Sequence, residues 1–467
     1  MQVQVLSGIY SDKTSQLRVS LPRNYIPVPT PSGISNGFLA PSPGLEVFSI
    51  GPGLDRGGIN WNGKLYRVMG SKLISVNEDG AVTELGDVGN NGKPVSLDYS
   101  FDRLSIASNN RLYYWDGGTF SQVTDPDLGI VIDQMFIGGY FMTTDGTSLV
   151  VTDLDDPFAV NPLKYGSSES DPDPVKAVKR IRTEAVALNR YTLEYFQNVG
   201  GDFFPFQRID GAMVQKGCVG THACCNYAES VAFVGGGRNE APGVYFALSG
   251  TAQKLSTREI DILLAGYSEE QLAACVLEEK IDKAHKHLML HLPDQCLVFD
   301  AAATEALGTP IWFTLTSSVV GLGQYRSRNH VWVYDKWIGG DPTSTNISVL
   351  TDLKSTHYGE VIGWDFATAA LYTEGTGAIV HNMELVGLPG GVEFGKDPVI
   401  WTSYSLDGAK WSQERPIQSG KFGETLKRLC WRRQGFIRNW RVQKFRGTSD
   451  NHQSIVRLEM ELEKLGM

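Results

Sequence analysis

Three closely spaced histidines could do chemistry in this sequence. His285, His287 and His291 fall on one face of a strand expected over residues 283–292, because side chains along a strand alternate between its faces. Imidazole nitrogens bind transition metals when a carboxylate or thiolate completes the ligand set. No carboxylate shares that face of the strand, so we expect a polar strand surface and no metal site.

The cysteines offer a second possible ligand set. Cys218, His222 and Cys224 have the spacing of one strand face, with Cys225 beside them. Structural zinc sites usually combine two short ligand pairs separated by a longer gap, and this cluster lacks the second pair. We therefore expect small buried thiols instead of a zinc site. Six cysteines in 467 residues do not make a disulfide framework, which favours folding in a reducing cytoplasm.

Other catalytic and ligand-binding motifs are absent or incomplete in the sequence. The acidic residues near Asp145 and Asp153 lack the glycine and closing glutamate of an EF-hand loop. Gly235–Gly237 precedes neither a helix nor a Lys-Ser/Thr pair, so a phosphate-binding loop is not indicated. Ser405–Trp411 is one residue short of the Asp-box of sialidases, and it predicts a hairpin. We expect no catalytic residue, no cofactor and no enzymatic activity.

The segment 421–446 holds the most uneven charge in the chain. It carries nine Lys or Arg and one acidic residue, a net charge of +8, whereas the whole chain carries −10 and the remainder therefore −18. A solvated sheet face, direct DNA contact and a docking surface for an acidic partner chain are all possible interpretations. Tryptophan and arginine together are typical of interfaces, which favours docking. The candidate docking residues are Lys427, Arg428, Trp431, Arg432, Arg433, Arg438, Trp440 and Arg441.

Repeated hairpins form the frame that must position these residues. From about residue 58 to 366, short apolar strands alternate with Asn-Gly or Asp-Gly turns, for example at Asn62-Gly63 and Asp145-Gly146. Comparable units recur every 40–50 residues or so, which is roughly the blade period of a β-propeller. We predict an all-β fold containing a propeller of about seven blades. An array of two-sheet sandwiches is the structural alternative.

The expected domain organisation has three parts. Residues 1–50 are proline-rich and predict an extended N-terminal arm that lies on a surface, with a disordered tail as the alternative. Residues 51–369 form the propeller, and residues 370–467 form a C-terminal β-sandwich. Two local features interrupt the propeller: an acidic loop at 166–174 and a short helix that begins with a capping box at Ser268–Gln271.

Composition excludes several classes of protein. Hydrophobic residues make up 42% and charged residues 20% of the chain, unlike a disordered or coiled-coil protein. The acidic net charge of −10 disfavours wrapping of nucleic acid by release of counterions. No apolar run approaches the length of about 18 residues that spans a bilayer, and no signal peptide is indicated.

An ordered series of short runs resembles a known family. The runs Thr192–Phe196, Phe203–Phe206, Met213–Gly217, Gly266–Leu272 and His291–Asp300 are similar to those of the packaged-DNA stabilisation proteins, or tail accessory factors (tail hubs), of P22-like short-tailed phages. The resemblance covers about residues 140–300 well and 320–440 loosely. The hairpin Ser405–Trp411 and the run Trp431–Arg438 resemble members of the wider family.

The resemblance implies a structural role in a virion tail. Members of this family form a ring, expected to be a hexamer, below the portal and its adaptor ring. They close the head after DNA packaging and carry tailspikes or fibres and a tail needle or plug. Double-stranded DNA is expected to pass through the lumen without specific binding, no membrane is involved, and assembly takes place in the host cytoplasm. A receptor-binding module of a virion and a glycan-active propeller enzyme are the alternatives.

Overall fold

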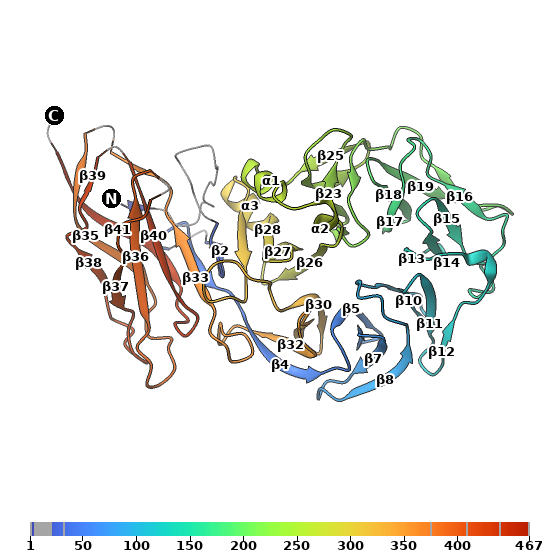
Figure 1. Ribbon diagram of the computed structural model, residues 1–467, viewed down its shortest axis with the longest axis horizontal. Helices are drawn as coiled ribbons and strands as arrows, with labels where there is room; N and C mark the ends of the chain where they lie inside the picture. Colours follow the sequence, from blue (N-terminus) through green and yellow to red (C-terminus); the bar gives the residue numbers. More distant parts are fainter. Residues whose placement is uncertain are drawn as a thin grey trace.

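The computed structural model describes residues 2–3, 21–30, 33–373, 376–407, 410–438 and 440–465. Its strands build a ring of small sheets beside two further sheets that pack face to face (Figure 1). The predicted all-β class, with a propeller and a C-terminal sandwich, is confirmed, and the array of sandwiches is excluded. No helix in these ranges is long and apolar enough to cross a membrane.

Seven sheets of the described chain form the propeller blades. The first blade contains β5 (Asp55–Trp61), β6 (Lys64–Met69), β7 (Lys72–Val76) and β8 (Val82–Asp87). The second contains β9 (Ser96–Tyr99), β10 (Leu104–Ser108), β11 (Arg111–Trp115) and β12 (Phe120–Gln122), and a single 3₁₀ turn, η1 (Pro126–Leu128), follows it. The third contains β13 (Asp133–Ile137), β14 (Tyr140–Thr144), β15 (Ser148–Val151) and β16 (Tyr165–Ser167).

The next three blades follow in chain order. The fourth contains β17 (Val175–Ile181), β18 (Glu184–Asn189), β19 (Leu193–Asn198) and β20 (Phe206–Arg208). The fifth contains β21 (Gly217–Cys218), β22 (Cys224–Tyr227), β23 (Ser230–Gly236), β24 (Gly243–Leu248) and β25 (Thr251–Lys254). The sixth contains β26 (Val276–Asp282), β27 (His285–His291), β28 (Cys296–Asp300) and β29 (Trp312–Leu315).

The seventh blade closes the ring with strands from both sides of the propeller sequence. It contains β30 (Arg328–Val333), β31 (Lys336–Gly340) and β32 (Asn346–Thr351), and its outer strand is β4 (Gly44–Ile50). The strand β4 pairs antiparallel with β32, from Gly44 opposite Thr351 to Ile50 opposite Asn346. The first and last strands of the propeller are therefore held in one sheet.

Local sequence explains the hairpins. Asn62 and Gly63 both have positive φ (52° and 73°), as the predicted tight turn between β5 and β6 requires. Asn109 and Asn110 join β10 to β11 in the same way, with φ of 51° and 61°. Asparagine tolerates this backbone region because its short side chain can bond to nearby backbone groups.

The sandwich consists of two sheets that enclose an aromatic core. One sheet contains β1 (Gln2–Val3), β2 (Tyr25–Pro29), β3 (Gly37–Pro41), β35 (Ala378–Gly387), β38 (Leu429–Arg432), β39 (Phe436–Ile437) and β41 (Ile455–Lys464). The other contains β33 (Gly363–Ala367), β34 (Leu371–Tyr372), β36 (Val399–Ser405), β37 (Arg415–Gln418) and β40 (Trp440–Thr448). Phe366 stacks on Phe445 at 5.4 Å between ring centroids, and Tyr25 meets Trp364 edge-on at 5.0 Å.

The proline-rich N-terminal segment differs from the expected arm wherever it is described. Residues 25–50 form β2, β3 and β4, so this stretch supplies strands to the sandwich and then to the closing blade. Tyr25 is fully buried and its hydroxyl donates to the Gln453 carbonyl at 2.8 Å. Pro27 and Pro29 fit β2 because it is an edge strand, where a missing backbone donor costs least. Residues 1, 4–20 and 31–32 of the expected arm lie outside the described ranges.

The described chain has three short helices, two between the fifth and sixth blades and one within the sixth. They are α1 (Arg258–Leu264), α2 (Glu269–Ala273) and α3 (Ala301–Leu307). The predicted capping box is confirmed, since Ser268 and Gln271 bond reciprocally at the start of α2. The helix α3 was not expected from the sequence. It begins where the Asp300 carboxylate accepts from the backbone N–H of Ala302 and Ala303.

Candidate functional site

The basic segment 421–446 does not form one continuous face. The strands β38 and β39 belong to the larger sheet of the sandwich, whereas β40 belongs to the smaller one. The eight candidate residues consequently fall into groups with different surroundings.

Two of the candidates lie inside the sandwich. Trp431 is 4% exposed, and its indole N–H donates to the Arg415 carbonyl at 3.1 Å. Arg441 is fully buried and donates to the Gln434 carbonyl at 2.6 Å, and its guanidinium lies 3.9 Å from the centre of the Tyr404 ring. Burial lowers the pKa of Arg441 to about 10. Neither side chain is available to a partner, because packing and internal hydrogen bonds use both of them.

Two other candidates lie beside acidic neighbours. Arg428 forms a two-pronged ion pair with Glu384, with 2.8 Å between Nε and Oε1, and Lys427 lies 3.5 Å from Glu424. The Glu384 carboxylate raises the pKa of Arg428 above its ordinary value through a direct hydrogen bond. These pairs cancel part of the charge that the sequence showed.

The remaining four candidates lie at or near the surface, as does Arg428, whose side chain is 74% exposed. Arg432, Arg433 and Arg438 are exposed, and Trp440 is half-buried beside Ala367 and Val442. Arg432 and Arg433 line a cavity of about 770 Å³ together with Arg415 from β37, and we call these three arginines with their cavity the basic cavity. Arg415 comes from outside the segment 421–446, and only the pairing of strands in the sandwich reveals it.

The predicted histidine face exists, but neighbouring strands bring carboxylates to it. In β27 the three histidines alternate with residues of the opposite face, as predicted. Asp300 of β28 lies directly opposite His287, and Glu278 of β26 lies diagonally from His291. The expectation that no carboxylate lies on this face was based on one strand alone. It was wrong, because the neighbouring strands bring Asp300 and Glu278 to the same face.

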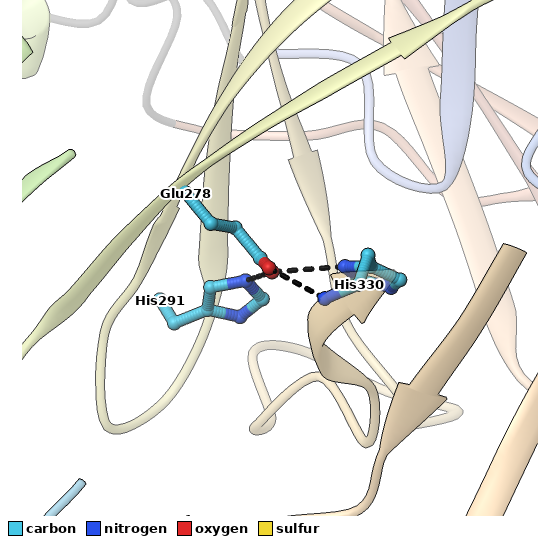
Figure 2. Close-up of side chains that lie close together, drawn as sticks. All are labelled: Glu278, His291 and His330. Carbon is cyan, nitrogen blue, oxygen red and sulfur yellow. Dashed lines mark hydrogen bonds and ion pairs between the residues drawn. The ribbon is translucent and has the colours of Figure 1, made fainter. Parts of the chain in front are cut away.

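One of the resulting clusters joins two blades. Glu278 Oε1 lies 2.5 Å from His291 Nε2 in the sixth blade and 2.9 Å from Nδ1 of His330 in the seventh (Figure 2). The other carboxylate oxygen accepts from the backbone N–H of His330 at 2.7 Å. Burial lowers the pKa of His330 although Glu278 opposes this, and the two histidines hold the pKa of Glu278 well below its usual value despite burial.

A second cluster lies on the same strand face. The carboxylate of Asp300 contacts His285 Nδ1, and its Oδ2 lies 3.5 Å from Nε2 of His287. Hydrogen bonds from these histidines lower the pKa of Asp300, although burial works in the opposite direction. Asp300 also caps the N-terminus of α3, which gives this residue a structural role in the fold.

The expected strand face of Cys218, His222 and Cys224 is not present in the fold. Cys218 lies on β21 and Cys224 on β22, while His222 lies in the turn between them, so the three do not share one strand. Within the described chain, only the two histidine–carboxylate clusters bring three or more possible ligand atoms together. All six thiols are free, and Cys218 and Cys224 are buried, as predicted.

Two glycine and turn motifs have structural explanations. Gly235 faces the Gly217 carbonyl so closely that a Cβ atom would lie 1.8 Å from it, so this glycine permits close strand packing in the fifth blade. In the Asp-box-like turn, Ser405 bridges to Trp411 and Asp407 accepts from the Lys410 N–H, which confirms the predicted hairpin. Gly408 and Ala409 of that turn lie outside the described residues.

Comparison with known protein families gives two consecutive matches. Residues 1–355 match the family described as bacteriophage P22 Gp10, β-propeller, and residues 363–463 match bacteriophage P22 Gp10, β-sandwich. A curated relative, the tail hub protein gp10 of Salmonella phage P22, is 27% identical over 459 residues, which cover 94% of each chain. The interval between the two matches lies between β32 and β33, where the described chain leaves the propeller.

Solved structures are more distant. The N-terminal domain of Nup159 aligns over 71% of this chain and 99% of its own, with a TM-score of 0.41 and 10% identity. PorZ of Porphyromonas gingivalis aligns over 79% of this chain and 46% of its own, with a TM-score of 0.40 and 12% identity. Scores this low carry no information about function.

Proposed function

Because this chain belongs to the family of bacteriophage P22 Gp10 and is a tail-hub protein by descent, we propose that it closes the portal vertex after DNA packaging. In this proposal it also attaches tailspikes or fibres and the tail needle, and six copies form the ring. Assembly takes place in the host cytoplasm, and the finished ring remains in the virion tail until DNA ejection.

The observation that carries this proposal is the continuity of the match. The curated relative aligns over 94% of both chains, so the propeller and the sandwich are related together and in the same order. A propeller shared by itself would say little, because one fold serves many unrelated functions. Homology to a structural tail protein also favours a role without catalysis.

The distribution of charge supports different roles for the acidic part of the chain and for the basic cavity. Outside 421–446 the net charge is −18, which would let DNA pass through a lumen without tight phosphate contacts. The basic cavity of the sandwich suits an acidic surface on the adaptor or on a neighbouring copy, and such contacts weaken as salt screens them.

Native mass spectrometry tests the proposal directly. The purified chain is measured alone and then after mixing with its cognate portal–adaptor assembly at low salt. Six copies bound to the assembly are expected. A chain that stays monomeric and ignores the assembly contradicts the tail-hub proposal, and an isolated trimer would instead indicate a receptor-binding module.

A further inference from the structure

Three nitrogen and oxygen donors from two blades converge in the cluster of Glu278, His291 and His330. Their ligand atoms all lie within 4.8 Å of one another, and both imidazoles approach the same carboxylate oxygen (Figure 2). The His330 side chain is fully buried, and those of Glu278 and His291 are 11% and 8% exposed. Nothing in the proposed tail-hub function requires such a cluster.

Hydrogen bonds behind His330 indicate which of its ring nitrogens carries a proton. The Gly339 carbonyl can only accept, and Ser348 Oγ donates to it at 3.2 Å. Ser327 Oγ lies 2.9 Å from Ser348 Oγ and must then be the donor in that bond. The Ser327 oxygen is left to accept from Nε2–H of His330 at 3.0 Å.

This direction of donation has a consequence on the other side of the ring. A neutral His330 with its proton on Nε2 presents a bare lone pair at Nδ1, which faces the Glu278 carboxylate at 2.9 Å. Two electron-rich atoms at this distance need a cation between them. His291 Nε2 approaches the same oxygen at 2.5 Å and adds a third donor, which fits a metal ion better than a single proton.

We propose that Glu278, His291 and His330 bind one divalent transition-metal ion, with Zn²⁺ as the preferred species. Two imidazoles and one carboxylate are a ligand set that zinc uses when it keeps a fourth position for water or another ligand. The Ser327 hydroxyl behind His330 is the kind of outer partner that orients a ligating imidazole.

A cavity beside the cluster gives the ion access to the site. A cavity of about 380 Å³ borders His291 and is also lined by Gln324, Tyr325 and Arg328. In a tetrahedral site with metal bonds of about 2.0–2.2 Å, neighbouring donor atoms lie ~3.4 Å apart. Glu278 Oε1 lies 2.5 Å and 2.9 Å from the two ring nitrogens, so it moves by less than ~1 Å when the ion binds. The bound ion ties β26 and β27 of the sixth blade to β30 of the closing blade.

The test uses the full-length chain, stripped of metal with a chelator and titrated with Zn²⁺ in a calorimeter. One ion per chain is expected, together with a higher thermal unfolding midpoint. His291→Asn removes one donor and should weaken binding by at least tenfold or so, in line with loss of a zinc ligand. The matched control His285→Asn changes the second histidine cluster and should bind Zn²⁺ as the wild type does.

Cobalt separates this site from the cysteines. Co²⁺ bound to nitrogen and oxygen donors gives visible ligand-field bands without the near-ultraviolet charge-transfer band of a cobalt–thiolate bond. A wild-type chain that responds to neither ion overturns the proposal and leaves a protonated hydrogen-bonded cluster. A thiolate band, or loss of binding in His285→Asn but not in His291→Asn, overturns it as well. The wild-type cobalt spectrum decides the question if His291→Asn does not fold.

Discussion

At the level of single residues, the propeller depends on a buried charge that the sequence analysis did not single out. Asp55 of β5 and Arg67 of β6 form an ion pair with both side chains fully buried, at 2.6 Å between Oδ1 and Nη2. The other oxygen of Asp55 accepts from the Asn329 amide at 2.7 Å. The pair therefore connects the first blade to the closing blade.

Asp55→Asn should destabilise the propeller strongly, because it leaves the buried Arg67 without a charge partner. We expect a loss of about 3–5 kcal/mol in the free energy of unfolding, measured by urea denaturation. The matched control is Glu229→Gln, which breaks the pair between Arg182 and Glu229, both largely exposed. That change should cost about 0–1 kcal/mol. Equal losses in the two variants would contradict this account.

His357 gives the protein a dependence on pH that can be measured. Burial, assisted by Arg326 and opposed by Asp341, lowers the pKa of His357 from 6.5 to about 3. Between these values the unfolded chain binds a proton that the folded chain excludes, so stability is highest above pH 6.5 and falls as the pH decreases. The contribution approaches about 1.4 kcal/mol per pH unit within this window.

His357→Gln should flatten this dependence. The variant cannot take up the proton, so its free energy of unfolding should fall less than that of the wild type between pH 6.5 and 4.5 in urea denaturation series. The same slope in His357→Gln and the wild type would show that this site does not contribute.

The histidine cluster shows how far sequence could predict a site. Alternation along β27 correctly placed His285, His287 and His291 on one face. Strand alternation alone contains no information about which residues of β26, β28 and β30 lie opposite. Glu278 and His330 are 52 positions apart in sequence, and only the pairing of strands and the packing of blades bring them together.

Among the elements, β4 has the most influence on the propeller as a whole. It is the outer strand of the closing blade and comes from before the first blade in sequence. Leu45 of β4 is fully buried in a cluster that includes Met289 and Phe313 of the sixth blade. The side chain of Val47, two residues further along the strand, is 49% exposed.

Leu45→Ala should therefore weaken the closure of the ring. Removal of a fully buried leucine side chain costs about 2–5 kcal/mol, and we expect a loss of this size in urea denaturation. Val47→Ala is the matched control on the same strand and should cost less than about 1 kcal/mol. If the two variants lose the same stability, β4 does not hold the blade through its buried side chain.

Element prediction succeeded where local rules decide the structure. Asn-Gly and Asn-Asn turns dictate positive φ, and they gave hairpins such as β5–β6 and β10–β11. The prediction for residues 25–50 failed for a different reason. The prolines indicated an extended chain, but they contain no information about its partner strand. Leu39 pairs with Ile455, more than 400 residues later.

At the scale of the whole molecule, the basic cavity determines how the ring should respond to salt. Arg432→Glu combined with Arg433→Glu should weaken binding to the portal–adaptor assembly about tenfold at low salt, with a smaller effect at high salt. Surface plasmon resonance across a salt series measures both effects. The control reverses two exposed charges on the propeller, Lys93→Glu with Arg111→Glu, and should leave binding unchanged. Equal effects of the two double variants would exclude a local docking surface.

The paired position of the sandwich strands also has a consequence for synthesis of the chain. The strands β2 and β3 leave the ribosome early, yet Ile455, the residue that pairs with Leu39 of β3, emerges more than 400 residues later. At translation rates of about 5–20 residues per second, this delay is on the order of 20–80 seconds. The propeller can close as soon as β32 has emerged, while the sandwich must wait for β41. A nascent chain whose translation stops after β32 and before β41 thus carries a closed ring without a complete sandwich.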